Sequence, residues 1–192
     1  MSAPDIKALT VKFAQLVNAH LAAFRAEKAN SNNKELKEVP ELKVVVNSQA
    51  ATKIRTPEEQ AQQVLAGRSW TCSSSHMTDN ARHVGLNKNG RYVKAASREL
   101  DEDEFKAFKE IWNSAMVACG LRNYKGELGY NESDAYHLEL PDSKLPFSDK
   151  RVQACLLHYA EETRDNGKKK NVKFESHSTI KKYLQEYEKK NG

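Results

Sequence analysis

Hydrophobic residues recur every three or four positions between residues 5 and 26. The remaining positions of this stretch are polar, so the pattern predicts an amphipathic helix that packs one face against another part of the protein. The polar, turn-rich residues 27 to 39 predict a linker after it. The apolar stripe of the predicted helix consists of Ile6, Leu9, Phe13, Leu16, Val17, Leu21 and Phe24.

A β-branched run and a capped helix follow the linker. Residues 42 to 46, LKVVV, predict a strand of a central sheet. Thr56 and Pro57 are typical of the cap and first turn of a helix, which Gly67 can end. The next 25 residues, up to about Val93, are too polar for a helix and contain the hairpin dipeptide Asn89-Gly90.

Residues 101 to 119 carry a strong helical pattern, with Asp101 as a cap and Gly120 as a stop. An alternating stretch that ends at Pro141 then predicts a strand. Helical patterns return at 148 to 164 and at 176 to 190. The buried face of the first of these helices is predicted to contain Phe105, Phe108, Ile111, Trp112, Ala115, Met116 and Cys119.

Composition narrows the class of protein. The chain has 192 residues, a hydrophobic fraction of 39% and a charged fraction of 30%, which favours one soluble globular domain with appendages. No apolar run approaches the roughly 18 to 20 residues that span a bilayer, so membrane insertion is not expected. The three cysteines, an odd number without a CxxC pair, indicate neither a disulfide framework nor a thiolate zinc site. The first residues lack the pattern of a secretory signal, so we expect synthesis in the cytoplasm.

The formal net charge of +5 suits any polyanionic partner. Many of the lysines lie in the last quarter of the chain, interleaved with glutamates, and this pattern favours a solvated helix face. Arginines and aromatic residues are not interleaved with these lysines, so a nucleic-acid partner is not favoured.

Three histidines offer a candidate metal site. His76 and His83 are seven residues apart in the polar segment, and His137 lies on the later predicted strand, three residues after Asp134. Catalytic zinc needs about three nitrogen or oxygen ligands, one open position and a nearby carboxylate. The four residues satisfy that requirement, although their spacing alone is not specific.

Three sequence blocks surround these residues. Ser74 to His83, SSHMTDNARH, matches the form SxHxxGxAxD in its Ser, first His and Ala. Upstream, Arg55 is followed five residues later by Gln60; downstream, residues 134 to 140 are DAYHLEL. In these blocks, their order and their separations, residues 42 to 141 resemble the zinc peptidases of peptidoglycan, the D-alanyl-D-alanine carboxypeptidases and phage L-alanyl-D-glutamate endopeptidases.

The resemblance implies an α+β fold in which a small antiparallel sheet, with helices packed on one side, carries a zinc site. Residues 39 to 141 would form the peptidase-like core. Residues 1 to 38 would be a helical N-terminal arm and linker, and residues 142 to 192 a helical, Lys-rich extension.

The resemblance also implies the ligands and the base. His76, His83 and His137 would hold Zn²⁺, and Asp134 would accept a proton from the attacking water. Glu132 is an alternative base.

Other residues of the blocks would act around the metal. Arg55 would hold the developing oxyanion or a substrate carboxylate, or else form a surface ion pair. Gln60 and Ser74 would be supporting residues, and Glu139 a partner of an imidazole. Trp70 is a candidate for substrate contact.

Two positions depart from the family pattern. Asp79 stands where the family has a glycine, a position often tied to left-handed backbone, which aspartate tolerates better than most residues. His83 replaces an aspartate ligand. Three alternatives follow: a three-histidine site, a site in which Asp79 is the oxygen ligand, and a descendant that has lost its metal.

The expected function is zinc-dependent hydrolysis of peptide bonds in peptidoglycan stem peptides, with L-Ala-D-Glu favoured over D-Ala-D-Ala. The protein would act on the cell wall after release, as an endolysin does, or be carried in a phage particle. The alternative is a catalytically inactive structural or binding protein, such as a virion component, that retains the fold. A basic nucleic-acid binder is a third, weaker reading.

Overall fold

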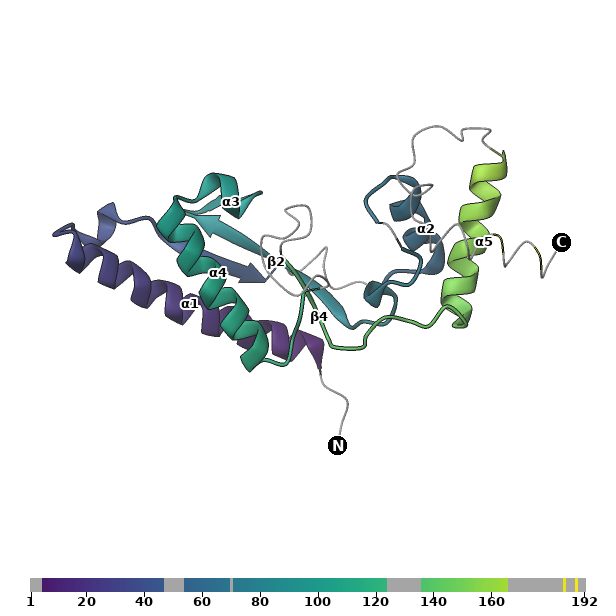
Figure 1. Ribbon diagram of the computed structural model, residues 1–192, viewed down its shortest axis with the longest axis horizontal. Coiled ribbons are helices and arrows are strands. Elements are labelled where there is room, and N and C mark those ends of the chain that lie inside the picture. The colour runs from purple at the N-terminus through teal and green to yellow at the C-terminus, as the bar shows by residue number, and fades with distance from the viewer. Residues whose placement is uncertain are drawn as a thin grey trace. The chain divides into compact units, whose positions relative to one another are not determined.

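The computed structural model describes residues 5–46, 54–69, 71–123 and 136–165, together with positions 185 and 189 (Figure 1). The chain forms two compact units, one of residues 1–53 with 80–142 and the other of residues 54–79 with 143–192. The predicted N-terminal arm therefore belongs to the first unit and the predicted C-terminal extension to the second. The helix predicted at 176 to 190 lies outside the described residues, apart from those two positions.

The first unit contains a small antiparallel sheet built around one long strand. This strand, β2, pairs with β1 along its second half, from Val84 to Lys88, and with β4 along its first half, from Ala81 to His83. The α+β class with a small antiparallel sheet is therefore confirmed. The strands are β1 (Leu42–Val46), β2 (Ala81–Lys88), β3 (Arg91–Tyr92) and β4 (His137–Glu139).

Two long helices pack on this sheet, α1 (Ile6–Ser31) and α4 (Glu102–Ala118), and Figure 1 shows them running side by side. Asp101 and Glu104 begin α4 with a reciprocal capping box. The core is centred on Phe13 and Trp112, both fully buried, whose ring centroids lie 4.7 Å apart in an edge-on arrangement. Helix α1 is longer than the predicted stretch that ends at residue 26, and Ala29 in its last turns is also buried. A short 3-10 helix, η1 (Leu36–Glu38), follows within the predicted linker.

Alternation along β2 gives the sheet two different faces. Val84 and Leu86 of β2, and Leu138 of β4, belong to the same buried cluster as Phe13 and Trp112. Successive side chains of a strand point to opposite faces. His83 and Gly85, and with them His137, therefore lie on the face opposite the helices. Helix α3 (Ala96–Glu99) completes the unit.

The second unit packs α2 (Pro57–Leu65) against α5 (Lys150–Asp165). Both helices were predicted, from the cap at Thr56 and from the pattern after residue 148, but their contact was not. Thr56 and Glu59 form the capping box of α2. None of the described helices combines the length and the apolarity that crossing a membrane requires. The core of this unit consists of Ala61, Val64, Cys72, Met77, Leu145, Val152, Cys155, Leu156 and Tyr159.

Candidate metal centre

Two of the predicted ligands are direct partners across the sheet. His83 of β2 pairs with His137 of β4. The amide of Val84 donates to the carbonyl of Tyr136 at 3.1 Å, so the histidines occupy the adjacent, non-hydrogen-bonded position of the ladder. Side chains approach each other most closely at such positions. The two imidazole rings meet edge to face, with centroids 5.1 Å apart and an interplanar angle of 74°.

The third predicted ligand, His76, lies on a short 3-10 helix, η2 (Ser75–Met77). The hydroxyl of Ser74 accepts a hydrogen bond from the amide of His76 at 3.3 Å, and the carbonyl of His76 accepts one from the amide of Arg55 at 3.0 Å. Ser74 is buried. The backbone of His76 is therefore held on both sides by residues of the sequence blocks.

A left-handed residue joins η2 to β2. Asp79 has a φ of 61°, inside the region that glycine adopts without strain. Two residues later Ala81 begins β2, which leads to His83. The backbone requirement inferred for this position from the sequence is confirmed, and aspartate meets it here.

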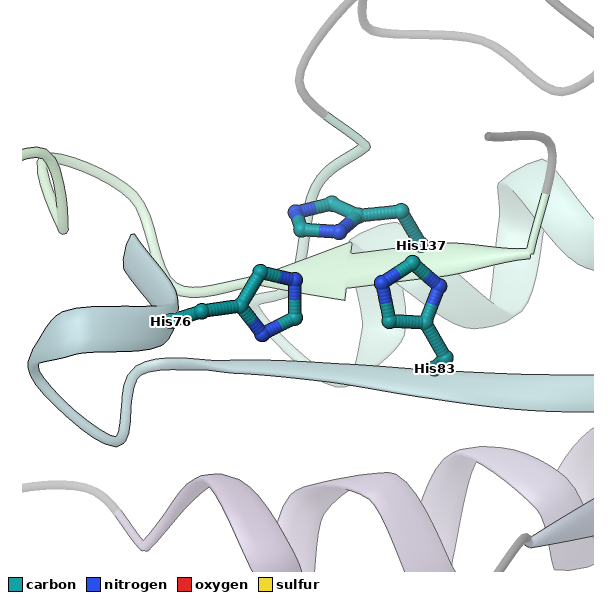
Figure 2. Close-up of side chains that lie close together, drawn as sticks. All are labelled: His76, His83 and His137. Atoms are coloured by element: carbon teal, nitrogen blue, oxygen red, sulfur yellow. The ribbon is translucent and has the colours of Figure 1, made fainter. Parts of the chain in front are cut away.

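The side chains of His76, His83 and His137 gather into one group, in which each offers a ligand atom within 4.8 Å of the others. Figure 2 shows the three rings facing one another. Asp79 is not a member of the group. Nitrogen ligands around a tetrahedral Zn²⁺ lie about 3.4 Å apart for bonds of about 2.0 to 2.1 Å, a spacing shorter than the 4.8 Å within which these ligand atoms lie. Three imidazoles suit zinc and also other transition metals, and the group can hold a metal ion.

A buried carboxylate orients one of the imidazoles. The Nε2 atom of His137 lies 3.1 Å from Oε2 of Glu139, and Arg122 donates from Nε to the other carboxylate oxygen at 3.1 Å. Glu139 is 2% exposed and His137 is 5% exposed. A metal-binding histidine commonly donates its second N–H to a carboxylate in this way, which fixes the tautomer and leaves the other nitrogen for the metal. Glu139 thus has the contact expected of a partner residue.

Arg122 was not predicted from the sequence. It lies 17 residues before Glu139, and the two exchange both backbone hydrogen bonds, N to O at 2.9 and 2.8 Å. Next to it, the side-chain Nδ2 atom of Asn123 donates to the carbonyl of His137 at 3.0 Å. This short stretch therefore supports β4 along its free edge, a role that no local pattern in the sequence indicates.

Arg55 and Gln60 also meet. Nη1 of Arg55 donates to Oε1 of Gln60 at 3.0 Å. Gln60 is fully buried, and its Nε2 donates to the Ser69 hydroxyl at 2.9 Å and to the Thr71 carbonyl at 2.7 Å. Gln60 thus ties the guanidinium of Arg55 to the chain that leads into η2.

Three predicted residues lie outside the described residues: Asp134, the base; Glu132, its alternative; and Trp70, the candidate substrate contact.

Comparison with known proteins adds no assignment. A scan against protein-family models, a search of curated proteins and a search of solved structures each returned no match for this chain.

Proposed function

We propose that this protein is a zinc-dependent peptidase of peptidoglycan stem peptides, with the L-Ala-D-Glu bond as the favoured target. The observation that carries the proposal is the meeting of His76, His83 and His137, which were selected from the sequence blocks alone. The contact of Glu139 with His137 adds to it, because a carboxylate behind an imidazole is typical of metal ligation.

Each side chain of the site would have its own role in binding the metal. His76, His83 and His137 would hold the ion as neutral imidazoles. When bound, Zn²⁺ would polarise the scissile carbonyl and lower the pKa of the attacking water. Glu139 would keep the N–H of His137 directed away from the ion, and Arg122 would keep Glu139 in place.

Proton transfer would fall to Asp134. Its carboxylate would take a proton from water as the water oxygen bonds to the carbonyl carbon, and would return the proton to the leaving amine as the C–N bond breaks. The guanidinium of Arg55, oriented by its hydrogen bond to Gln60, would pair with the developing oxyanion or with a carboxylate of the substrate. The net reaction is the hydrolysis of one amide bond by one water molecule.

The decisive experiment is digestion of purified peptidoglycan with and without a chelator, followed by mass spectrometry of new amino termini. We expect new termini only in the untreated sample, and their masses identify the bond that is cut. The Asp134→Ala protein should retain zinc and lose turnover. Absent or chelator-insensitive cleavage would exclude the peptidase and leave a binding or structural role.

Zinc content tests the ligand set independently of turnover. His83→Ala should lose stoichiometric zinc, whereas His83→Asp, which restores the ligand of the resembled family, should keep it. His20→Ala is the matched control, because His20 is exposed on α1 and should not affect zinc. Full zinc in His83→Ala would remove His83 from the ligand set.

A further inference from the structure

The sheet face that carries the histidines continues beyond them along β2. Gly85 and Asn87 follow His83 at intervals of two residues, so both lie on the same face. Val45 of β1 is the partner of Gly85, and Tyr92 of β3 is the partner of Asn87. A short row of side chains therefore leads away from His83 along the sheet.

Tyr92 and Val45 close over Gly85. A Cβ atom added to Gly85 would lie 3.1 Å from Cε2 of Tyr92 and 3.1 Å from Cγ2 of Val45, which is tighter than nine in ten real Cβ contacts. Gly85 is buried, whereas Tyr92 is 57% exposed. The Tyr92 ring thus rests on the glycine with Val45 beside it, and part of the ring surface remains open to solvent. We call Tyr92 and Val45 the platform.

Lys43 lies next to the platform, on the side away from His83. Lys43 is the β1 partner of Asn87, two residues from Val45 and on the same face of the sheet. It is exposed, and within the described part of the chain it has no ion-pair partner. By contrast, Lys88, on the opposite face of β2, is held by Glu104 at 2.6 Å. Lys43 is therefore a cation that is available to an anionic ligand on this face.

The distances from His83 to Gly85 and to Asn87 equal the distances between residues of an extended peptide. A strand advances about 3.3 to 3.4 Å per residue, which places Gly85 about 7 Å and Asn87 about 13 Å from His83. An extended peptide lying along the sheet covers the same distances with two and with four residues. A ligand whose reacting bond is at the histidines would thus reach the platform with its second residue and Lys43 with its fourth.

We propose that the platform and Lys43 form a subsite for the extended peptide that the histidine site cuts, with Tyr92 contacting the peptide about two residues from the cut bond and Lys43 pairing with its terminal carboxylate. This inference rests on the proposed function and names where its substrate lies. The cavity of about 460 Å³ that Tyr92 borders is a weaker candidate, because two of its charged residues, Lys88 and Glu99, are already bonded within the protein.

The test uses the full-length, zinc-loaded Asp134→Ala protein and the synthetic stem pentapeptide L-Ala-γ-D-Glu-L-Lys-D-Ala-D-Ala, whose terminal carboxylate is on the fourth residue after the L-Ala-D-Glu bond. The peptide is used as the free acid and as the C-terminal amide, in calorimetric titrations. Tyr92→Ala should weaken binding about tenfold, since a stacked aromatic contact is lost. Lys43→Ala should weaken binding of the acid about threefold and leave binding of the amide unchanged. Controls are Val117→Ala and Lys106→Ala, exposed positions of α4 that should not affect binding.

The outcomes separate the subsite from the proposed function. If the peptide binds, and the wild-type protein cuts peptidoglycan, but Tyr92→Ala and Lys43→Ala bind like the parent, the subsite is wrong and the peptidase stands. If the Asp134→Ala protein does not bind the peptide and the wild-type protein does not cut peptidoglycan, both are overturned. Zinc content and circular dichroism of each variant show that a loss of binding is not a loss of metal or fold.

Discussion

His137 and Glu139 stand two residues apart on β4 with their side chains on the same face, and the imidazole Nε2 lies 3.1 Å from the carboxylate Oε2. Both are buried, and Arg122 occupies the second carboxylate oxygen. The contact sets the tautomer of His137 and directs its Nδ1 atom elsewhere. We predict that Glu139→Gln lowers zinc affinity by about 10- to 100-fold, the usual cost of removing such a partner.

Competition with a chromophoric zinc chelator measures this change. Glu110→Gln is the matched control, because Glu110 is exposed on α4 and far along the chain from the histidines. Circular dichroism establishes that the variant is folded. Unchanged zinc affinity in folded Glu139→Gln would show that the carboxylate stabilises β4 without supporting a metal.

Asp79 gives a second prediction, because its φ of 61° is a left-handed backbone conformation. Asp79→Ala places a Cβ there without a polar side chain and should lower the free energy of unfolding by about 1 kcal/mol. Asp79→Gly removes the steric conflict and should unfold within about 0.5 kcal/mol of the parent, because the greater freedom of the unfolded glycine offsets the gain. Urea denaturation compares the two.

The same pair of variants tests the metal ligands. Because the metal group contains His83 and not Asp79, both variants should bind zinc like the parent. Loss of zinc in both would support the alternative in which Asp79 is the oxygen ligand. Equal stability of Asp79→Ala and Asp79→Gly would contradict the backbone argument.

The third prediction concerns helix α1, whose Phe13 is fully buried against Trp112 at 4.7 Å between ring centroids. Phe13→Ala should destabilise the first unit by about 3 to 5 kcal/mol, the cost of a large cavity in a packed core. Val11→Ala on the same helix, where Val11 is 41% exposed, should cost less than about 0.5 kcal/mol. Urea denaturation followed by tryptophan fluorescence measures both, and similar values would mean that α1 does not pack on α4.

Local patterns predicted much of the fold because they depend on neighbours in the sequence. The caps at Thr56 and Asp101 and the buried stripe of the helix around Trp112 are of this kind. The three histidines were predicted from motif blocks, and the left-handed backbone at Asp79 from the glycine that the family pattern has there.

Contacts between distant segments were not predictable in the same way. Arg122 meets Glu139 only because residues 121–123 return along the edge of β4, and the sequence between them carries no periodic pattern that requires this. Helix α2 packs on α5, which begins nearly a hundred residues later. Helix α2 therefore belongs to the second unit, whereas β1, the strand before it, belongs to the first. Tyr92 was not singled out because its contact with Gly85 depends on the register of the β2–β3 hairpin.

The last prediction concerns the thiols, all three of which are free and buried. A hydrogen bond with the thiol of Cys72, together with burial, raises the pKa of Cys155, and burial raises the pKa of Cys119. A raised thiol pKa means that the reactive thiolate is scarce at pH 8, so both cysteines should react slowly with a disulfide reagent such as Ellman's reagent in the native protein. We expect little release of the coloured product before denaturation, and release equivalent to all three thiols in guanidinium chloride. Rapid release from the native protein would show that these cores open readily or that a thiol is activated, and Cys155→Ser would then identify the reactive residue.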